Sequence, residues 1–368
     1  MHRGKRLRSY LRSIRVNKES KENIMKLMKT EEAVGQVLCH DITQIIPGVT
    51  KDAVFRKGHI ITKEDIPVLL SVGKEHIYIW ERDEHMLHEN EAAQILYEMC
   101  RNEHMHPSAV KEGKIELIAD CDGLFKVDRE KLRKVNSLGE MMIATRHGNT
   151  FVKKGDKLAG TRIIPLVIEK EKMERAKEIC NDGSILEIKP LQPQKAAILT
   201  TGSEVYHGRI QDKFTPVLVE KLKEYGSEVI FHEIYDDDHE AITKGCLSAI
   251  EQGAEIVLCT GGMSVDPDDK TPLAIKNTGA RIVSYGAPVL PGAMFLVSYY
   301  EYKDKTIPIV GLPGCVMYAK RTIFDLALPR LLANDFITAE ELALLGEGGL
   351  CLNCPVCTYP NCGFGKGW

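Results

Sequence analysis

The stretch AEIVLCTGGMSVDPDDKTPLAIKNTG, residues 254–279, contains the pattern of a strand, a loop and a helix in direct succession. It begins with a short apolar run, which is typical of a strand that is buried on both faces of a parallel sheet. Gly261 and Gly262 interrupt the run, and apolar residues return at helical spacing after Thr271. A strand that leads through a glycine loop into a helix is the repeating unit of an α/β fold.

The same alternation extends in both directions from this stretch. Strands are predicted at KAAILTTG, SEVIFHEIY and ARIVSY, and a hairpin at MFLVSYYEYKDKTIPIVGLPG. Helices are predicted at DKFTPVLVEKLKEYG and DHEAITKGCLSAIEQG, with a last one running through Leu332. We therefore expect residues 190–336 to form an α/β domain with a doubly wound, mostly parallel sheet and helices on both faces.

The rest of the chain shows a different pattern of predicted strands and helices. Residues 25–185 predict a mixed α+β region, with strands at 32–42 and 76–80, a helix at 89–104 and a small antiparallel β module near 140–170. A linker is expected near Pro190 and Pro193. Residues 1–24 are basic and predict a disordered extension, with a transit peptide or a nucleic-acid arm as alternatives.

Composition excludes several classes of protein. The 368 residues carry 49 basic and 52 acidic side chains, a net charge of -3, which argues against general nucleic-acid binding. No apolar run approaches the roughly 18 residues of a membrane span. Five cysteines occur singly in apolar or helical contexts, as buried reduced thiols do, and predict a cytoplasmic protein: Cys39, Cys100, Cys180, Cys246 and Cys259.

Three glycine-rich loops, TTGSE, CTGGMS and VGLPG, each follow a predicted strand. The carboxyl ends of parallel strands meet at one edge, where ligands of such sheets bind, and exposed loop amides suit a phosphate. Asp266, Asp268 and Asp269 bring carboxylates to the same place. Asp268 is expected to cap the next helix, and the remaining acids indicate a Mg²⁺-assisted site for a phosphorylated small molecule.

The motifs TGSEV, GRIQD, YDDDHEAI, TGGMSVDPDDKT, LPGAM and GLPG resemble, in order and spacing, the molybdopterin-binding domain of molybdenum cofactor biosynthesis. This domain occurs in molybdopterin adenylyltransferases and molybdopterin molybdotransferases. The resemblance implies catalytic roles for Asp269 and Glu204, and Mg²⁺ binding by Asp238 and Asp269. It also implies cofactor-binding roles for Thr201, Gly202, Ser203, Gly261, Gly262, Ser264, Pro291, Gly292, Pro313, Gly314 and Cys315.

The chain departs from the family pattern at several positions. Asp266 replaces a glycine, and Leu290 and Ala293 stand where the molybdotransferases carry basic residues. Pterin binding is therefore a firmer expectation than molybdate insertion. The hypotheses are a transferase of adenylyl groups or molybdate, a non-catalytic carrier or sensor of the finished cofactor, and a nucleotide pyrophosphatase of the competence-damage-induced type. Implied partners are the pterin, ATP or the adenylated pterin, a molybdoenzyme and a second copy of the chain, with a dimer favoured.

The Cys-rich tail, residues 345–368, contains CLNCPVCTYPNC at 351–362. Its C-x2-C-x2-C-x4-C spacing predicts that Cys351, Cys354, Cys357 and Cys362 bind an iron–sulfur cluster or zinc, with no metal as the third alternative. The flanking glycines predict a flexible appendage.

Overall fold

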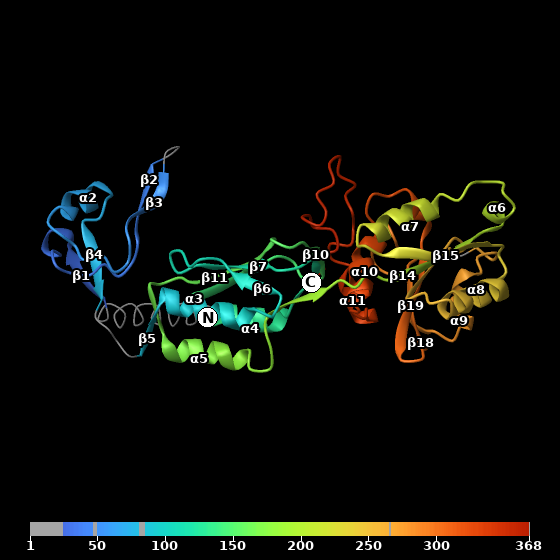
Figure 1. Cartoon of the computed structure of the whole chain (residues 1–368), viewed down its shortest axis with the longest axis horizontal. Helices are drawn as coiled ribbons and strands as arrows, with labels where there is room; N and C mark the ends of the chain where they lie inside the picture. The colour runs from blue at the N-terminus through green and yellow to red at the C-terminus, as the bar shows by residue number, and fades with distance from the viewer. Residues whose placement is uncertain (1–24, 47–49, 81–84, 265, 368) are drawn as a thin grey trace, which may run out of the picture.

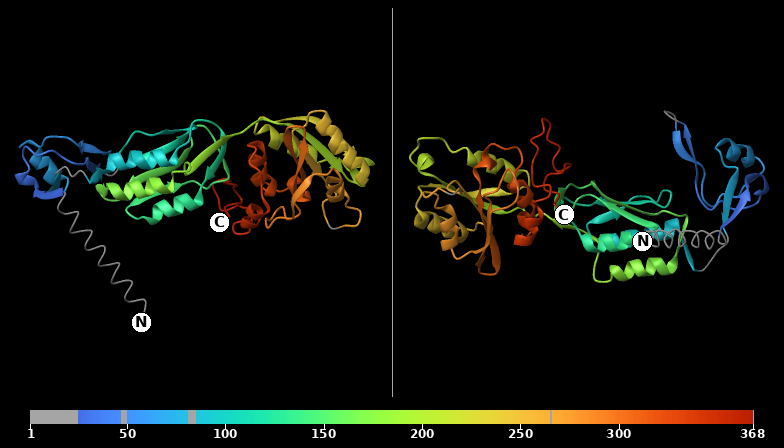
Figure 2. Two further views of the ribbon diagram at one scale, coloured as in Figure 1. Left: turned by 90° about the horizontal axis from the view of Figure 1, so that it is seen from below. Right: turned by 180° about the vertical axis from the view of Figure 1, so that it is seen from behind.

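The computed structural model describes residues 25–46, 50–80, 85–264 and 266–367. The basic extension 1–24 lies outside this range. Three units follow one another along the chain, an N-terminal unit to residue 80, a middle unit from 85 to 190 and a C-terminal domain from 195 (Figures 1 and 2). Within the described part, no helix is long and apolar enough to cross a membrane.

The N-terminal unit is a small β structure with one helix. Its elements are β1 (Met25–Lys29), η1 (Thr30–Glu32), β2 (Ile42–Ile46), β3 (Thr50–Phe55), α2 (Asp65–Ser71) and β4 (His76–Trp80). β1 pairs with β4, and β2 with β3, both antiparallel. The predicted strand at 76–80 is confirmed. The one predicted at 32–42 is wrong except at its last residue, because Gly35 takes a positive φ of 85° and turns the chain, and only isolated bridges follow at Val37 and Leu38.

The middle unit packs helices on antiparallel sheets around a separate apolar core. Its helices are α3 (Glu89–Cys100), α4 (Arg129–Ser137) and α5 (Lys170–Ile179). Its strands are β5 (Met86–His88), β6 (Met105–Pro107), β7 (Ile115–Ala119), β8 (Gly123–Val127), β9 (Met141–Thr145), β10 (Thr150–Val152), β11 (Lys157–Ile163), β12 (Val167–Glu169) and β13 (Leu186–Pro190). They pair as β6-β7-β11-β9, β10-β8-β13 and β12-β5. The helix predicted at 89–104 is confirmed over α3.

The C-terminal domain is built on one six-stranded sheet with the order β15-β14-β16-β19-β18-β17. Its strands are β14 (Lys195–Thr201), β15 (Glu228–Tyr235), β16 (Ile256–Thr260), β17 (Arg281–Tyr285), β18 (Leu296–Tyr302) and β19 (Lys305–Leu312). Its helices are α6 (Ser203–Tyr206), α7 (Phe214–Lys223), α8 (His239–Glu251), α9 (Thr271–Asn277), η2 (Gly314–Met317), α10 (Ile323–Leu332) and α11 (Ala339–Leu344). β14, β15, β16 and β19 are parallel, and β18 runs against both of its neighbours.

Alternate residues of β14 pack against helices on opposite faces of the sheet. Ala196 and Ile198 pack into the core formed with α7 and α10, whereas Ala197 and Leu199 pack into the core formed with α8 and α9. Every residue from Ala196 to Thr201 is buried, because successive side chains point to opposite faces and both faces carry helices. The predicted α/β class, the mostly parallel sheet and the β18–β19 hairpin are confirmed.

The tail packs on this domain, so the expectation of a flexible appendage is wrong. Phe364 is buried in the core beneath α10, and Cys351, Tyr359 and Cys362 pack against the same core. The hydroxyl of Tyr359 donates to the carbonyl oxygen of Asp325 at 2.9 Å, and its ring lies under the guanidinium of Arg321. Over its described residues, 345–367, the tail adopts no helix or strand and is held by these side-chain contacts instead.

Asp335, which follows α10, joins the C-terminal domain to the middle unit. Its carboxylate accepts hydrogen bonds from Lys126 of β8 and Lys189 of β13, each at 2.8 Å, and from Arg330 at 2.7 Å. Burial raises the pKa of this carboxyl, but the three cations outweigh that effect and lower the pKa to about 2. These ion pairs connect the two units; we call the group centred on Asp335 the ionic joint.

Candidate functional site

The carboxyl ends of the central strands converge at one edge of the sheet. Thr200 of β14 lies in register with Thr260 of β16, and Thr260 with Leu312 of β19. The loops after β14 and β16 therefore start side by side, although about 60 residues separate them in sequence. This is the edge where the sequence predicts a ligand site.

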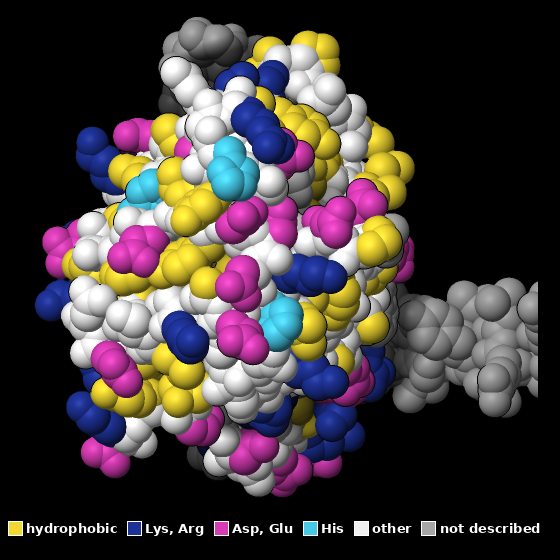
Figure 3. Space-filling model, turned by 90° about the vertical axis from the view of Figure 1, so that its right-hand side faces the viewer, with side chains coloured by type: hydrophobic (Ala, Val, Ile, Leu, Met, Phe, Trp, Pro, Cys, Tyr) yellow, Lys and Arg dark blue, Asp and Glu magenta, His cyan; other side chains and the backbone are white. Residues whose placement is uncertain are grey.

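An open pocket of about 670 Å³ lies between these loops; we call it the acidic pocket. Seven of its lining residues are acids and one is a lysine, Lys213. The acids are Glu204, Asp212, Asp236, Asp237, Asp266, Asp268 and Asp269. Figure 3 views the end of the molecule that carries α6 and α8, and acidic side chains gather across the middle of that face. The pocket is electrostatically suited to a cation or to an anion that brings cations with it.

Glycine is required where the two loops touch. Gly261 has a φ of 82°, and a Cβ atom there would overlap the carbonyl oxygen of Thr201. Gly262 has a φ of 52°, and its Cβ would lie 2.9 Å from the hydroxyl of Thr271. The buried hydroxyl of Thr201 bridges the same loops, contacting the Thr260 carbonyl at 3.0 Å and the Thr271 hydroxyl at 2.9 Å. The loops after β14 and β16 are thus held together by close backbone contact, which only glycine permits at this point.

Asp269 holds the glycine loop closed through its carboxylate. Its Oδ2 accepts from the amide of Ser264 at 2.7 Å, and its own amide donates to the carbonyl of Asp266 at 3.0 Å. Asp237 fixes the facing loop by accepting from the amide of Ser203 at 3.0 Å. Burial raises the pKa of Asp237 against the effect of that hydrogen bond, and neighbouring carboxylates raise it further. The pocket therefore concentrates negative charge that its own hydrogen bonds only partly offset.

Asp212 is the best-connected acid of the pocket. It accepts from the amides of Phe214 and Thr215 at the start of α7, and from the hydroxyl of Thr200 at 3.0 Å. His232 lies 3.4 Å away and also contacts the Thr215 hydroxyl at 2.9 Å. Burial raises the pKa of Asp212, but these hydrogen bonds outweigh it and lower the pKa below its usual value. The folded state therefore favours the ionised form of Asp212.

Most of the predicted site residues from the first two loops line the acidic pocket: Thr201, Gly202, Ser203, Glu204, Gly261, Gly262 and Asp269. Asp238, predicted to bind Mg²⁺, lies elsewhere, because its side chain caps α8 by accepting from the amides of Glu240 and Ala241. Asp268 lines the pocket instead of capping α9, whose N-cap is Lys270. Ser264 contributes its amide to the closed loop and is not a lining residue.

The predicted residues of the later loops are not part of the lining. Pro291 lines a cavity with the cysteines of the tail, and Gly292 lies against Ile323 of α10. Pro313, Gly314 and Cys315 follow β19 at the correct edge, but Met317 is the residue of this segment that reaches the acidic pocket. Sequence reasoning missed Met317, Asp236, Lys213 and His232. Asp236 alone had a signal, because it adjoins the acids of the YDDDHEAI motif.

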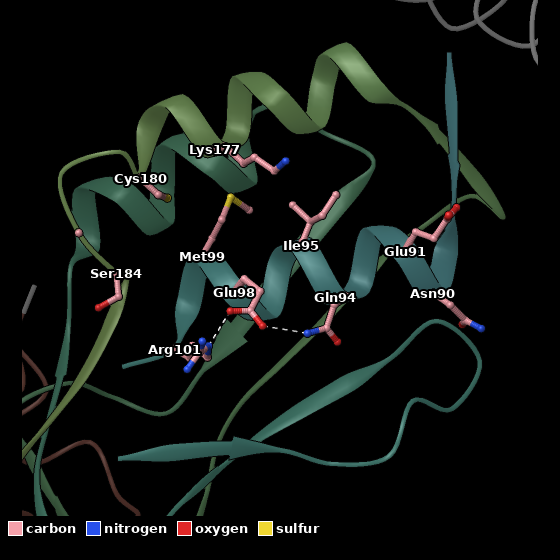
Figure 4. A pocket seen from close by; sticks show the side chains of 11 residues that line it. Asn90, Glu91, Gln94, Ile95, Glu98, Met99, Arg101, Lys177, Cys180 and Ser184 are labelled. Atoms are coloured by element: carbon pink, nitrogen blue, oxygen red, sulfur yellow. Dashed lines mark hydrogen bonds and ion pairs between the residues drawn. The ribbon is translucent and has the colours of Figure 1, made fainter. Parts of the chain in front are cut away.

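A larger hollow of about 840 Å³ lies in the middle unit between α3 and α5 (Figure 4). Its polar rim is satisfied internally, since Glu98 accepts from Gln94 at 2.9 Å and from Arg101 at 2.6 Å. Ile95 and Met99 of α3 contribute apolar side chains to its wall. Its lining holds two acids, Glu91 and Glu98, and one glycine, Gly183, against the seven acids and paired glycine loops of the acidic pocket, so volume alone does not mark the candidate site. In the described residues, moreover, no three His, Cys, Asp or Glu side chains converge to hold a metal ion.

Comparison with known proteins gives two family matches. Residues 197–333 match the family described as "Probable molybdopterin binding domain", and residues 27–81 match a domain of unknown function. The chain is 26% identical to the molybdopterin adenylyltransferase of Pyrococcus furiosus over 135 residues, which are 37% of this chain and 76% of that protein. It is 26% identical to the molybdopterin molybdenumtransferase of a Nostoc species over 196 residues, 51% of this chain and 44% of that one.

Other relatives share shorter parts. A CinA-like protein of Mycobacterium tuberculosis is 34% identical over 77 residues, only 18% of its length. A solved structure, the tungsten cofactor synthesizing protein MoaB from Pyrococcus furiosus, is 21% identical with a TM-score of 0.30, over 34% of this chain and 84% of that one. Residues 197–333 are thus similar to the molybdopterin-binding domain, as the sequence motifs predict.

Proposed function

We propose that the chain acts in molybdenum cofactor biosynthesis by binding the phosphorylated pterin in the acidic pocket and transferring an adenylyl group to it. The observation that carries the proposal is the pocket itself, where glycine loops suited to a phosphate are surrounded by seven carboxylates. An adenylyltransferase must bring two phosphorylated molecules together, and the volume of about 670 Å³ falls within the range of small-molecule sites.

The proposal includes Mg²⁺, because one lysine cannot offset the repulsion between these carboxylates and a phosphate. Carboxylate oxygens are the ligands that Mg²⁺ prefers, and Glu204, Asp237 and Asp269 lie close enough for the charges of the other two to act on Asp237. When bound, the ion would neutralise phosphate oxygens and stabilise their charge during transfer. The chain's own residues orient the ligand, since Asp269 and Asp237 hold the two loops at fixed spacing.

The test is incubation of the purified full chain with molybdopterin, ATP and Mg²⁺. Formation of adenylated pterin and pyrophosphate is the expected result. Release of a mononucleotide from ADP-ribose or NAD, without adenylated pterin, would instead identify a nucleotide pyrophosphatase. Failure to bind molybdopterin with or without Mg²⁺ would contradict the proposal.

A carrier or sensor of the finished cofactor is the second candidate. It is favoured by the scarcity of cations: Lys213 is the one basic residue of the pocket lining, and Leu290, at a position basic in the molybdotransferases, is 57% exposed beside the tail. Molybdate is an anion, so its insertion has little electrostatic support in this pocket. Pterin that binds tightly and is recovered unchanged after incubation with ATP would support the carrier.

Further expectations accompany the proposal. A cytoplasmic location, a homodimer and delivery of the pterin to a molybdoenzyme follow from the kind of pathway rather than from the pocket. The iron–sulfur or zinc centre expected in the tail is independent of pterin binding, because none of the four cysteines lines the acidic pocket.

A further inference from the structure

The four cysteines of the tail border a single cavity of about 320 Å³, which we call the thiol cavity. All four are free thiols. They come from a segment of twelve residues without helix or strand, and all four line the same cavity. We propose that Cys351, Cys354, Cys357 and Cys362 hold a thiophilic metal centre in this cavity.

Two of the four thiols are anchored to the domain. Cys351 donates its amide to the carbonyl of Leu290 at 2.8 Å, and Cys351 and Cys362 both pack against the core beneath α10. These contacts place the first and last ligands on a rigid surface. A site with half of its ligands already fixed loses less conformational freedom when the metal binds.

The other two thiols lie on the exposed loop between the anchors. Cys354 and Cys357 are exposed, and no three thiols converge in the conformation described, so binding requires this loop to move inward. Leu352 and Val356 on the same loop are 78% and 77% exposed, which is unfavourable for large apolar side chains. Closure of the loop over a metal centre would allow them to cover it.

The chemistry of the lining selects a soft metal. The cavity contains no carboxylate and no histidine among its lining residues, and its basic lining residues are Lys320 and Arg321. On its other side Cys362 shares a small pocket with Arg146 and Lys366. The thiolate is the form of cysteine that ligates metals. Thiolates select zinc, copper(I) or iron–sulfur clusters over Mg²⁺.

The spacing of the cysteines favours a cluster, because the C-x2-C-x2-C start of the motif is a spacing of iron–sulfur ligation. An iron–sulfur cluster is therefore the form that we expect, with zinc as the alternative on the same four ligands.

The segment after β19 borders both cavities. Met317 lines the acidic pocket, and Lys320 and Arg321 line the thiol cavity only three and four residues later. A metal centre in the tail would thus be built against the wall of the pterin site. The centre does not depend on pterin binding, and either proposal can fail without the other.

The test is anaerobic purification of the full chain, followed by measurement of iron, acid-labile sulfide and zinc per chain. The expected result is a cluster with visible absorption that bleaches on reduction with dithionite, or one zinc ion. Cys354→Ser and Cys357→Ser should lower the bound metal to background, and their exposed side chains make these changes harmless to packing. Cys121→Ser, a partly buried cysteine outside the tail, is the matched control and should retain full metal.

Two results would overturn the proposal. One is wild-type chain that contains neither iron nor zinc above the level of the Cys354→Ser variant, even after reconstitution with iron and sulfide or with zinc. The other is full metal retention by the Cys354→Ser, Cys357→Ser double variant with an unchanged far-ultraviolet circular dichroism spectrum. Protease cleavage within residues 352–358 supplies a second readout, because metal removal should accelerate it at least tenfold.

Discussion

The acidic pocket and the thiol cavity lie in one domain but are built by different means. The acidic pocket is formed by loops at the ends of buried strands, where the sheet fixes every starting point. The thiol cavity is formed by a segment without regular structure that is held by a few side chains. The first is lined by carboxylates and the second by thiols, so the difference teaches that a single domain can present oxygen donors and sulfur donors in two separate cavities.

The largest effect expected is that of Gly261→Ala, which should damage the acidic pocket alone. The new Cβ would overlap the Thr201 carbonyl and impose a strained φ, so we expect a loss of about 3 kcal/mol in the free energy of unfolding. Urea unfolding measures it. Gly253→Ala is the control, because its φ is also positive at 101° but its Cβ meets no atom within 4 Å, and it should cost about 1 kcal/mol. Equal costs would refute the role of loop contact.

Asp269→Asn should separate the two cavities by chemistry. The amide oxygen can still accept from Ser264, but the charge is lost, so Mg²⁺-dependent turnover should fall at least about 100-fold, or about 2.7 kcal/mol. Pterin binding without Mg²⁺ and metal in the tail should be unchanged. Steady-state rates and titration calorimetry test this, with Asp268→Asn of the same pocket as the control. Turnover that survives intact would remove Asp269 from the proposed mechanism.

Asp212→Asn should measure how much the Asp212 carboxylate contributes to the free energy of unfolding. Losing the carboxylate weakens bonds from two amides and two hydroxyls, and we expect a cost of about 1.5 kcal/mol near neutral pH. Because the pKa of Asp212 is lowered in the folded state, its contribution is present above the usual value of 3.8 and is lost as pH falls through the folded pKa. Urea unfolding of both proteins should therefore converge at low pH, and a constant difference would contradict the prediction.

Tyr359→Phe should have the smallest effect and act on the tail alone. It removes the hydrogen bond to the Asp325 carbonyl while the ring stays under Arg321, which we expect to cost about 1 kcal/mol. Faster proteolysis of the tail, with unchanged pterin affinity, is the expected readout. A matching loss of pterin affinity would mean that the two cavities are not separate.

The sequence predicts the C-terminal domain well because its signals are local and repeated. Apolar runs followed by Gly202 or by Gly261 and Gly262 require both the strand and the turn, so sheet class and loop position follow. The strand predicted at 32–42 fails because Gly35 turns the chain with a positive φ, which periodicity does not reveal.

Within the site, prediction was limited by side-chain direction. The sequence places Asp236, Asp237 and Asp238 together, but only the fold decides that Asp238 caps α8 while the other two line the pocket. His232 reaches Asp212 across neighbouring elements, and no sequence spacing encodes that contact. The order of the tail likewise depends on Phe364 and Tyr359 meeting α10, a long-range packing event.

The joint at Asp335 makes the melting of the middle unit and the C-terminal domain one event. A carboxylate shared by β8, β13 and Arg330 is lost to both units when either unfolds, so we expect a single calorimetric transition at neutral pH. Its pKa is lowered to about 2, so this coupling is complete above 3.8 and disappears as the pH falls toward 2. Separation into two transitions at acid pH, or in Asp335→Asn at neutral pH, would measure the cooperativity that one side chain confers.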